Sequence, residues 1–224
     1  MAPELPGALE CGKVLRDNGI QLAIGHSGAT YEEVLRAIES GYTHVTHMYS
    51  GMSGVKRVHL QRVAGVIETA LLRDELEVEF IGDGMHLPPH LVWLILKNKS
   101  RGKICVVTDA MRATAMSEGI YEFGGMEVLV EEGVAKLKDR SAFAGSVATM
   151  DRVVRFLVKD VGLTVEDAIT LVSFNPAKSA GVAERKGSIA LGKDADLVIF
   201  DAEFEVLMTM VQGNIVYSKL EKEG

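Results

Sequence analysis

The sequence predicts an α/β protein that contains part of a (β/α)8 barrel, followed by a small cluster of β-strands. Two observations support this fold class. Four short apolar runs rich in β-branched residues are each followed by a helical pattern, which is the repeat of a parallel barrel. After residue 187 the helical patterns stop and short strands follow, with a strong hairpin turn at Gly213-Asn214.

The first half of the chain supplies the strand–helix alternation. Strands are expected at 21–25, 43–47, 77–81 and 103–108, and helices at 7–18, 30–40, 63–72 and 88–97. Thr30 and Glu33 form a capping-box pattern, and Pro88 suits a first helical turn. Residues 50–62 are expected to form a long loop.

The second half changes character. A hairpin is expected at about 121–138, with its turn at Glu132-Gly133. Helices are expected at 146–159 and 164–174, and Asn175-Pro176 marks either a break or a new helix start. Short strands are then expected at 187–189, 196–200, 206–211 and 215–217. Four barrel units leave an open sheet edge, because a closed barrel needs about eight strands and 250 residues. The sequence is therefore either a fragment or has another topology.

Size and composition exclude several classes of protein. The chain has 224 residues, an apolar fraction of 47% and a charged fraction of 25%, which is typical of a globular protein. A net charge of −7 and the lack of a basic run argue against a nucleic-acid partner. No stretch is long enough for a membrane span. Cys11 and Cys105 cannot form a disulfide framework, which fits a reducing cytoplasm.

Polar side chains follow three of the expected strands. His26, His47 and Asp109 each stand where a strand ends, and in a parallel barrel such positions converge at one mouth. Two imidazoles and a carboxylate suit a divalent metal that activates water, with zinc or ferrous iron favoured by imidazole. Asp109 could equally cap the following helix. His44 lies three residues before His47, on the opposite strand face, and is expected to be a packing or surface histidine.

Several motifs occur together in a family order. They are GHSGAT at 25–30, THMYSGM at 46–52, GDGMH at 82–86, VTDA at 107–110, AGS at 144–146 and GSIALGKDADLV at 187–198. Together they resemble the motifs of the N-acetylglucosamine-6-phosphate deacetylases, within the amidohydrolase superfamily. The resemblance runs from Ala2 to about Tyr217.

This resemblance implies a domain organisation. Residues 1–186 would be part of a (β/α)8 TIM-type metal-dependent hydrolase barrel with the hairpin inserted at about 121–138, and residues 187–224 the C-terminal part of a small β-sandwich domain. Family members carry, before the matched region, the other β-sandwich half, the first barrel strands and an HLEGP motif with a metal-binding glutamate. We therefore expect this sequence to be the C-terminal part of a longer enzyme.

The resemblance also implies residue roles. His26 and His47 would bind the metal, and Asp109 would be the catalytic acid/base. The implied substrate-binding residues are Ser50, Gly51, Arg62, His86, Ala144, Gly145 and Ser146.

Some of these assignments have alternatives. Arg62 would bind the substrate phosphate, in some members across the dimer, but Arg57 competes because the loop after His47 is longer than usual. His86 would contact the phosphate or cap the next helix. Ser50 and Gly51 replace the family's Asn-Ala, so only backbone contacts to substrate are retained. Gly145, with its neighbours 144 and 146, either lines the sugar pocket or eases helix packing.

The implied reaction is hydrolysis of the acetamide of N-acetylglucosamine 6-phosphate to glucosamine 6-phosphate and acetate by a cytoplasmic homodimer. Because the glutamate ligand is not in this sequence, we expect little turnover by this chain alone. Two alternatives stay open: another amidohydrolase with a different amide substrate, such as a cyclic amidase relative, or a non-catalytic remnant that folds by self-association. Because the parallel sheet edge would otherwise be exposed, we expect a homodimer or a swap that buries the strand at 21–25.

Overall fold

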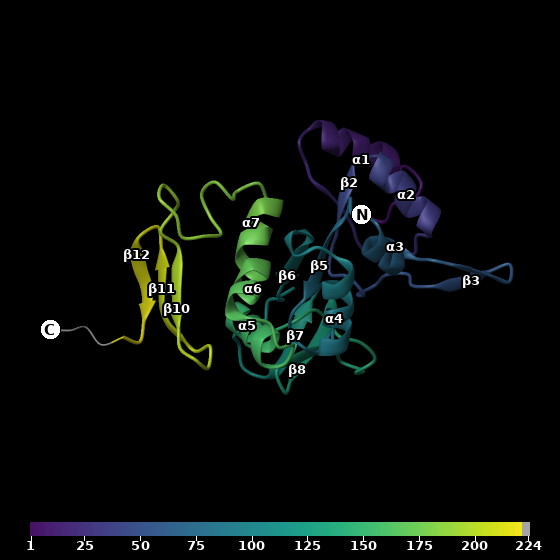
Figure 1. Ribbon diagram of the computed structural model, residues 1–224. Coiled ribbons are helices and arrows are strands. Elements are labelled where there is room, and N and C mark those ends of the chain that lie inside the picture. The colour runs from purple at the N-terminus through teal and green to yellow at the C-terminus, as the bar shows by residue number, and fades with distance from the viewer. Residues whose placement is uncertain (221–224) are drawn as a thin grey trace. The chain divides into compact units, whose positions relative to one another are not determined.

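The computed structural model of the protein describes residues 1–220 (Figure 1). The chain forms two compact units. The first contains residues 1–81 and 86–107, and the second contains residues 82–85 and the chain from Thr108 onward. The boundary expected after residue 186 stays a prediction, and residues 221–224 of that expected domain lie outside the described residues.

A four-stranded parallel sheet forms the centre of the first unit. Its strands are β1 (Leu22–Ile24), β2 (Tyr42–Val45), β5 (Glu77–Ile81) and β6 (Ile104–Val107), in the order β1-β2-β5-β6 (Figure 1). Each neighbouring pair is parallel, which confirms the prediction of four consecutive parallel strands. The fold is thus part of a barrel of the (β/α)8 type.

Four helices alternate with these strands and supply part of the apolar core. They are α1 (Ala8–Asp17), α2 (Tyr31–Glu39), α3 (Val66–Leu72) and α4 (Pro89–Asn98), with a 3-10 turn at Arg101–Lys103. Helix α2 begins with the predicted capping box, since the Glu33 carboxylate accepts the backbone N–H of Thr30 at 2.7 Å. Tyr42, Phe80 and Ile95 are among the fully buried side chains of the core.

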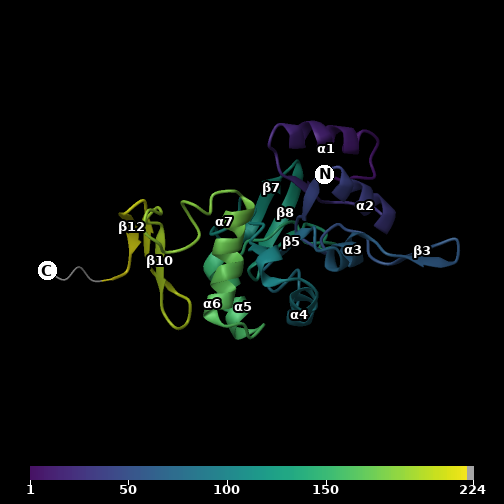
Figure 2. The same ribbon diagram turned by 45° about the horizontal axis from the view of Figure 1, so that its top comes forward.

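The region expected to be a long loop contains a hairpin instead. Strands β3 (Lys56–Val58) and β4 (Gln61–Val63) pair antiparallel and project from the first unit (Figures 1 and 2). The turn residues His59 and Leu60 have φ of 44° and 72°. Because neither is a glycine or asparagine, the sequence carried no turn signal for this hairpin. Helix α3 accordingly starts at Val66 rather than at 63.

A three-stranded antiparallel sheet opens the second unit. Its strands are β7 (Gly119–Phe123), β8 (Met126–Glu131) and β9 (Val134–Leu137), and β7 and β8 run side by side in Figure 2. The predicted turn at Glu132-Gly133 is confirmed, and a second turn at Gly124-Gly125 adds the strand that was not predicted. Val128, Val130 and Ala135 form a separate small core with Met111 and Ala113.

A helical segment follows in the second unit. It contains α5 (Met150–Lys159), α6 (Val165–Ile169), a π-helical turn (Thr170–Phe174) and α7 (Asn175–Ser179). Asn175-Pro176 was expected to mark a break or a new helix start; α7 begins there, but the backbone of Phe174 and Asn175 is helical, so the π-helical turn joins α6 to α7 without a break. Helix α5 starts four positions later than expected because Ser146 is held in extended backbone pairing with Ala110.

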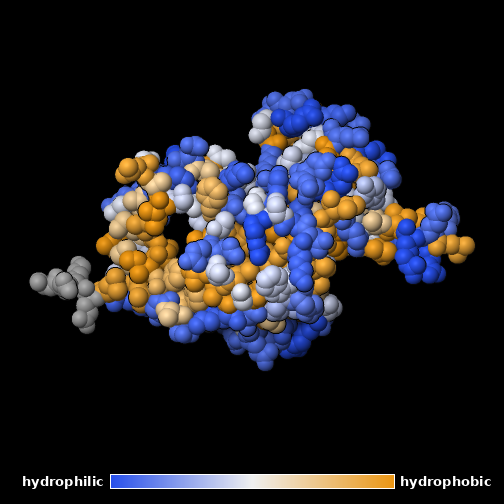
Figure 3. Space-filling view, viewed as in Figure 1, coloured by the Kyte–Doolittle hydropathy of each residue, from blue (hydrophilic) through white to orange (hydrophobic). Residues whose placement is uncertain are grey.

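The chain closes with a second antiparallel sheet. Its strands are β10 (Leu197–Phe200), β11 (Val206–Val211) and β12 (Asn214–Ser218), with Gly213 at φ 80° in the predicted turn. The strand expected at 187–189 is wrong: this segment is irregular and Ile189 is 89% exposed. Figure 3 shows a largely apolar surface over this sheet, to which Val198 and Ile215 contribute.

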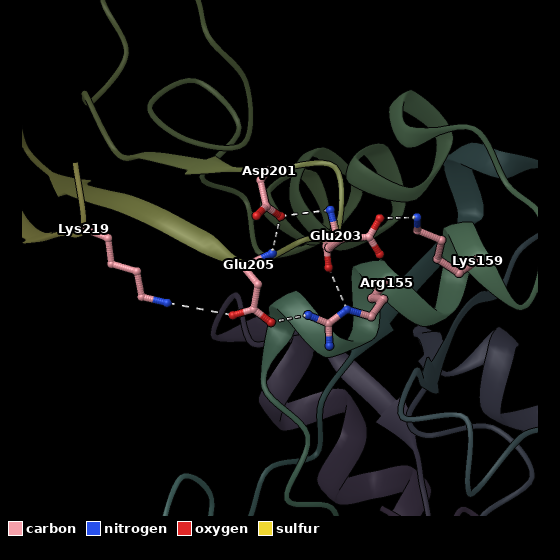
Figure 4. A network of polar contacts seen from close by, with 6 residues as sticks. All are labelled: Arg155, Lys159, Asp201, Glu203, Glu205 and Lys219. Atoms are coloured by element: carbon pink, nitrogen blue, oxygen red, sulfur yellow. Dashed lines mark hydrogen bonds and ion pairs between the residues drawn. The ribbon is translucent and has the colours of Figure 1, made fainter. Parts of the chain in front are cut away.

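The turn between β10 and β11 is fixed to helix α5. The Arg155 guanidinium donates to the Glu203 carbonyl at 2.8 Å and to the Glu205 carboxylate at 2.9 Å, and Lys159 pairs with Glu203 at 3.3 Å (Figure 4). Phe204, between the two glutamates, is buried at 4% exposure. Exposed ion pairs contribute little, so burial of this ring is the main stabilising contribution.

Candidate active site

The first unit brings two predicted ligands together. His26 follows β1 and His47 follows β2, and because these strands are parallel neighbours their carboxyl ends lie at the same edge. The two imidazole rings are 4.6 Å apart between centroids and meet edge to face at 84°. Imidazole rings this close together can bind one small ligand or ion through one nitrogen of each ring.

The backbone at all three predicted chemical positions is unusual. His26, His47 and Asp109 have φ of 48°, 27° and 49°. A non-glycine residue with positive φ destabilises the fold by about 1–3 kcal/mol and persists only where its surroundings hold it in place. Such strained residues cluster at functional sites. Other positive-φ residues such as Leu60 and Glu132 lie in hairpin turns. His26, His47 and Asp109 instead each lie two residues after the end of a parallel strand.

The turn after His47 packs against His26. The backbone N–H of Ser50 donates to the His47 carbonyl at 3.0 Å, so the chain reverses at once. Gly51 has φ of 60°, and a Cβ at this position would lie 2.8 Å from Nδ1 of His26. A larger residue here would displace the imidazole. Gly51, predicted to contact substrate, therefore contacts a predicted ligand.

Glu79 on β5 is a site residue that the sequence reasoning missed. Its Oε1 accepts the His47 N–H at 3.1 Å and the Thr46 hydroxyl, and its Oε2 lies 3.3 Å from Nε2 of His44. Burial raises the Glu79 pKa, but these hydrogen bonds outweigh burial, so the pKa lies below its usual range. A hydrogen bond to a charged acceptor contributes about 1.5–3 kcal/mol, which is enough to offset the strain at His47.

His44 was expected to be either a packing or a surface histidine, and its burial shows that it is a packing histidine. It is 7% exposed and lies between Glu79 and Glu77, with Nδ1 at 3.8 Å from the Glu77 carboxylate. Glu77 in turn lies 3.5 Å from Lys103. These groups form a polar cluster on one face of the sheet. The alternation of charged and apolar residues along 77–81 could have indicated it.

In the second unit, Asp109 lies against the segment 144–146. The Ser146 N–H donates to the Asp109 carbonyl at 3.0 Å, and the Met111 N–H donates to the Ser146 carbonyl at 2.8 Å. Gly145 has φ of 74°, and a Cβ there would lie 3.4 Å from the Asp109 carbonyl oxygen. The structure therefore brings together Asp109 and the residues expected to line the sugar pocket. Convergence of Asp109 with the two imidazoles stays a prediction.

The two arginines that competed for the phosphate role face each other. Arg57 on β3 and Arg62 on β4 are directly paired across the hairpin, and both are exposed. Like charges in opposite positions destabilise a hairpin unless an anion lies nearby. His86 is partly buried just before α4 and belongs to the first unit.

The two imidazoles fit part of a metal site. Nδ1 of His47 is buried, and within residues 1–220 it has no hydrogen-bond partner, as a nitrogen kept for a ligand would require. Over the same residues, no three His, Cys, Asp or Glu side chains gather closely enough to hold a metal ion. A complete site needs at least one further donor.

The second unit also has a cavity that is separate from the predicted residues. It has a volume of about 740 Å³ and lies among α5, the π-helical turn and β10–β11, with Phe174 and Phe204 in its wall. None of the predicted site residues lines it.

The fold is that of part of a (β/α)8-type barrel with polar residues just after its strand ends, and comparison gives the family. The model of the amidohydrolase family matches residues 5–216. The chain therefore belongs to the amidohydrolase family. In the described part of the chain, no helix combines the length and the apolar character needed to cross a bilayer.

Within this family, the chain is similar to curated proteins that are named as sugar-phosphate deacetylases. The chain is 36% identical over 223 residues to the N-acetylglucosamine-6-phosphate deacetylase of Bacillus subtilis (strain 168), covering 100% of this chain and 55% of that protein. It is 32% identical to the N-acetylgalactosamine-6-phosphate deacetylase of Escherichia coli O157:H7, with 96% and 55% covered. The chain thus spans about half the length of the curated relatives it matches.

Solved structures of proteins with the same names are also similar to this chain. The N-acetylglucosamine-6-phosphate deacetylase of Pasteurella multocida superposes with a TM-score of 0.88 at 32% identity, covering 96% of this chain and 55% of that chain. A mutant of the Mycobacterium smegmatis enzyme, in complex with N-acetyl-D-glucosamine-6-phosphate, gives 0.89 at 33% identity, with 97% and 57% covered.

Proposed function

We propose that this chain carries the catalytic half of a metal-dependent deacetylase that converts N-acetylglucosamine 6-phosphate to glucosamine 6-phosphate and acetate. The observation that carries the proposal is the contact between His26 and His47 at the ends of neighbouring parallel strands. The relatives named for this reaction support it.

His26 and His47 would hold the metal, zinc or iron, together with a donor from outside the described residues. When bound, the metal would polarise the acetamide carbonyl and favour deprotonation of water. Asp109 would take the proton from the attacking water and later give it to the leaving amine nitrogen. This is the chemistry that a linear amide requires.

The substrate would be held by its phosphate and its sugar. Arg62, with Arg57 opposite it, would bind phosphate oxygens, and His86 would contribute a further contact. Ser50 and Gly51 would contact the sugar through their backbone, and residues 144–146 would line its pocket beside Asp109.

We further propose that the enzyme works in the cytoplasm as a homodimer, with residues from 187 onward contributing to a β-sandwich domain. The free thiols of Cys11 and Cys105 support a reducing compartment. Exposed apolar side chains on β12, including Ile215 and Val216, support an apolar interface.

A hybrid enzyme tests the proposal. The matched region of the Bacillus subtilis relative is replaced by this chain, and acetate release is measured with zinc or iron present. We expect turnover of N-acetylglucosamine 6-phosphate by the hybrid and little by the chain alone, because no third metal donor is gathered within residues 1–220.

A substrate panel separates the alternatives. It contains N-acetylgalactosamine 6-phosphate, unphosphorylated N-acetylglucosamine and a cyclic amide. A folded, metal-loaded hybrid that is inactive on both sugar phosphates but active on the cyclic amide would contradict the proposed substrate. Near-normal turnover by the chain alone would contradict the need for a further metal donor. Inactivity of the loaded hybrid on every substrate would favour the non-catalytic remnant.

A further inference from the structure

Two carboxylates hold the turns that carry His26 and His47. Glu4 accepts the Ser27 hydroxyl at 2.7 Å with one oxygen and the Gly28 N–H at 2.6 Å with the other. Glu79 accepts the Thr46 hydroxyl and the His47 N–H. Each carboxylate accepts one hydroxyl and one backbone N–H from residues within four positions of the strand end.

Both carboxylates reach these turns from distant parts of the sequence. Glu4 precedes α1 and contacts residues 23 and 24 positions further on, and Glu79 on β5 contacts residues 32 and 33 positions before it. Neither contact is part of helix or sheet backbone pairing. Each therefore restrains the turn independently of the strand that precedes it.

The restraint acts where the backbone is strained. His26 directly precedes Ser27, and His47 directly follows Thr46, and both histidines have positive φ. Ser27 is 2% exposed, and its hydroxyl also accepts the Ala29 N–H at 3.1 Å, so the turn after β1 has few alternatives. The Met48 N–H additionally donates to the Glu79 carbonyl at 2.7 Å, which anchors the turn after β2 on both sides of His47.

We infer that Glu4 and Glu79 are positioning residues that hold the imidazoles of His26 and His47 in contact with each other. The inference rests on the proposed function only for what the imidazoles bind; the positioning itself does not depend on metal or substrate. Polar partners behind metal ligands typically change metal affinity or activity by about 10- to 100-fold when they are removed.

Glu77 provides a matched control. It lies on the same strand and the same sheet face as Glu79 and contacts His44 and Lys103, and it makes none of the hydrogen bonds described for residues 46–48. A variant of Glu77 changes the charge of the cluster without removing the acceptor for the His47 N–H.

The test uses the 224-residue chain in solution, without metal. Glu79→Gln, Glu4→Gln and Glu77→Gln are compared by NMR, which measures amide hydrogen exchange and the nuclear Overhauser effects between the two imidazole rings. In Glu79→Gln we expect exchange of the His47 amide to accelerate about tenfold, because a charged acceptor is replaced by a neutral amide oxygen, and the ring contacts to weaken. In Glu4→Gln the Gly28 amide should respond in the same way.

Amides of the sheet, such as that of Phe80, should keep their exchange rates in all variants. If the two carboxylates only stabilised the fold as a whole, exchange of the sheet amides would accelerate as well. If Glu79→Gln does not fold, Thr46→Val removes the hydroxyl alone and should weaken the ring contacts in the same direction. The inference is overturned if folded Glu79→Gln and Glu4→Gln keep the ring contacts and amide exchange of the parent, or if Glu77→Gln changes them equally. Because no readout uses metal or substrate, this outcome is independent of whether the hybrid enzyme is active.

Discussion

The imidazoles of His26 and His47 contact each other edge to face, with centroids 4.6 Å apart. They come from neighbouring parallel strands, and Nδ1 of His47 is buried and without a hydrogen-bond partner in the described part of the chain. This arrangement leaves one imidazole nitrogen available to bind a ligand.

Removing either imidazole should therefore release the metal. In the hybrid enzyme, His26→Ala and His47→Ala should each lower the zinc content after dialysis well below one ion per chain, as measured by elemental analysis. His59→Ala, at the exposed tip of the β3–β4 hairpin, is the control and should retain the metal. Full metal content in both site variants would show that these histidines are not ligands.

Arg62 should matter only for phosphorylated substrates. In the hybrid, Arg62→Ala should raise KM for N-acetylglucosamine 6-phosphate by about 10- to 100-fold, since a bond to a charged group is lost, and kcat should change less. The rate with unphosphorylated N-acetylglucosamine should not change. Arg57→Ala should have a smaller effect; a larger one would move the phosphate-binding role to Arg57, which faces Arg62 across the hairpin.

The two cysteines should differ in reactivity. Burial, with further contributions from Glu77 and Glu79, raises the pKa of the Cys105 thiol to about 12. A disulfide reagent at pH 8 should thus modify only Cys11 in the native chain and both thiols after denaturation. The Cys11→Ser variant, in its folded state, should not react with the reagent. Rapid modification of Cys105 in the folded protein would contradict the burial of β6.

Glu131 should make the second unit sensitive to acid. Hydrogen bonds from Arg140, and then from Lys136, lower its pKa from 4.5 to about 2. Because the folded pKa is the lower one, the stabilisation is present above about pH 4.5 and is lost as pH falls towards 2. Glu131→Gln and Arg140→Gln should each flatten the fall in the free energy of unfolding across this range, measured by urea titration. An unchanged slope in both variants would contradict this ion pair.

The parallel sheet could be predicted because its strands are continuous β-branched runs with helical patterns between them. Strand 77–81 was predicted to the residue, and the other three within one or two residues. The hairpin at 56–63 could not be predicted, because His59 and Leu60 adopt positive φ without a turn residue. The strand expected at 187–189 failed for a related reason: Gly187 has φ of 85°, and a Cβ there would lie 2.6 Å from the Cβ of Ala177.

The positions of His26, His47 and Asp109 just after strands made it possible to predict them as site residues. The carboxylates that hold the turns of the two histidines could not be predicted. Glu4 and Glu79 act through contacts with residues that are distant in sequence, and neither spacing nor composition predicts such contacts. For Asp109 the sequence left a cap and a catalytic role open. The cap is wrong, because no helix follows Asp109: the chain runs through turns from Ala110 to β7. The Asp109 carbonyl instead accepts the Ser146 N–H at 3.0 Å.

Asp109→Asn in the hybrid enzyme tests the central claim most directly. The variant keeps the shape of the side chain but cannot accept the proton of the attacking water. Acetate release from N-acetylglucosamine 6-phosphate and metal content are measured on the same preparations. We predict that kcat falls by roughly 10²- to 10⁴-fold while the metal is retained, as expected when a general acid/base is removed. A variant that keeps its metal and turns over at the parent rate would contradict the account.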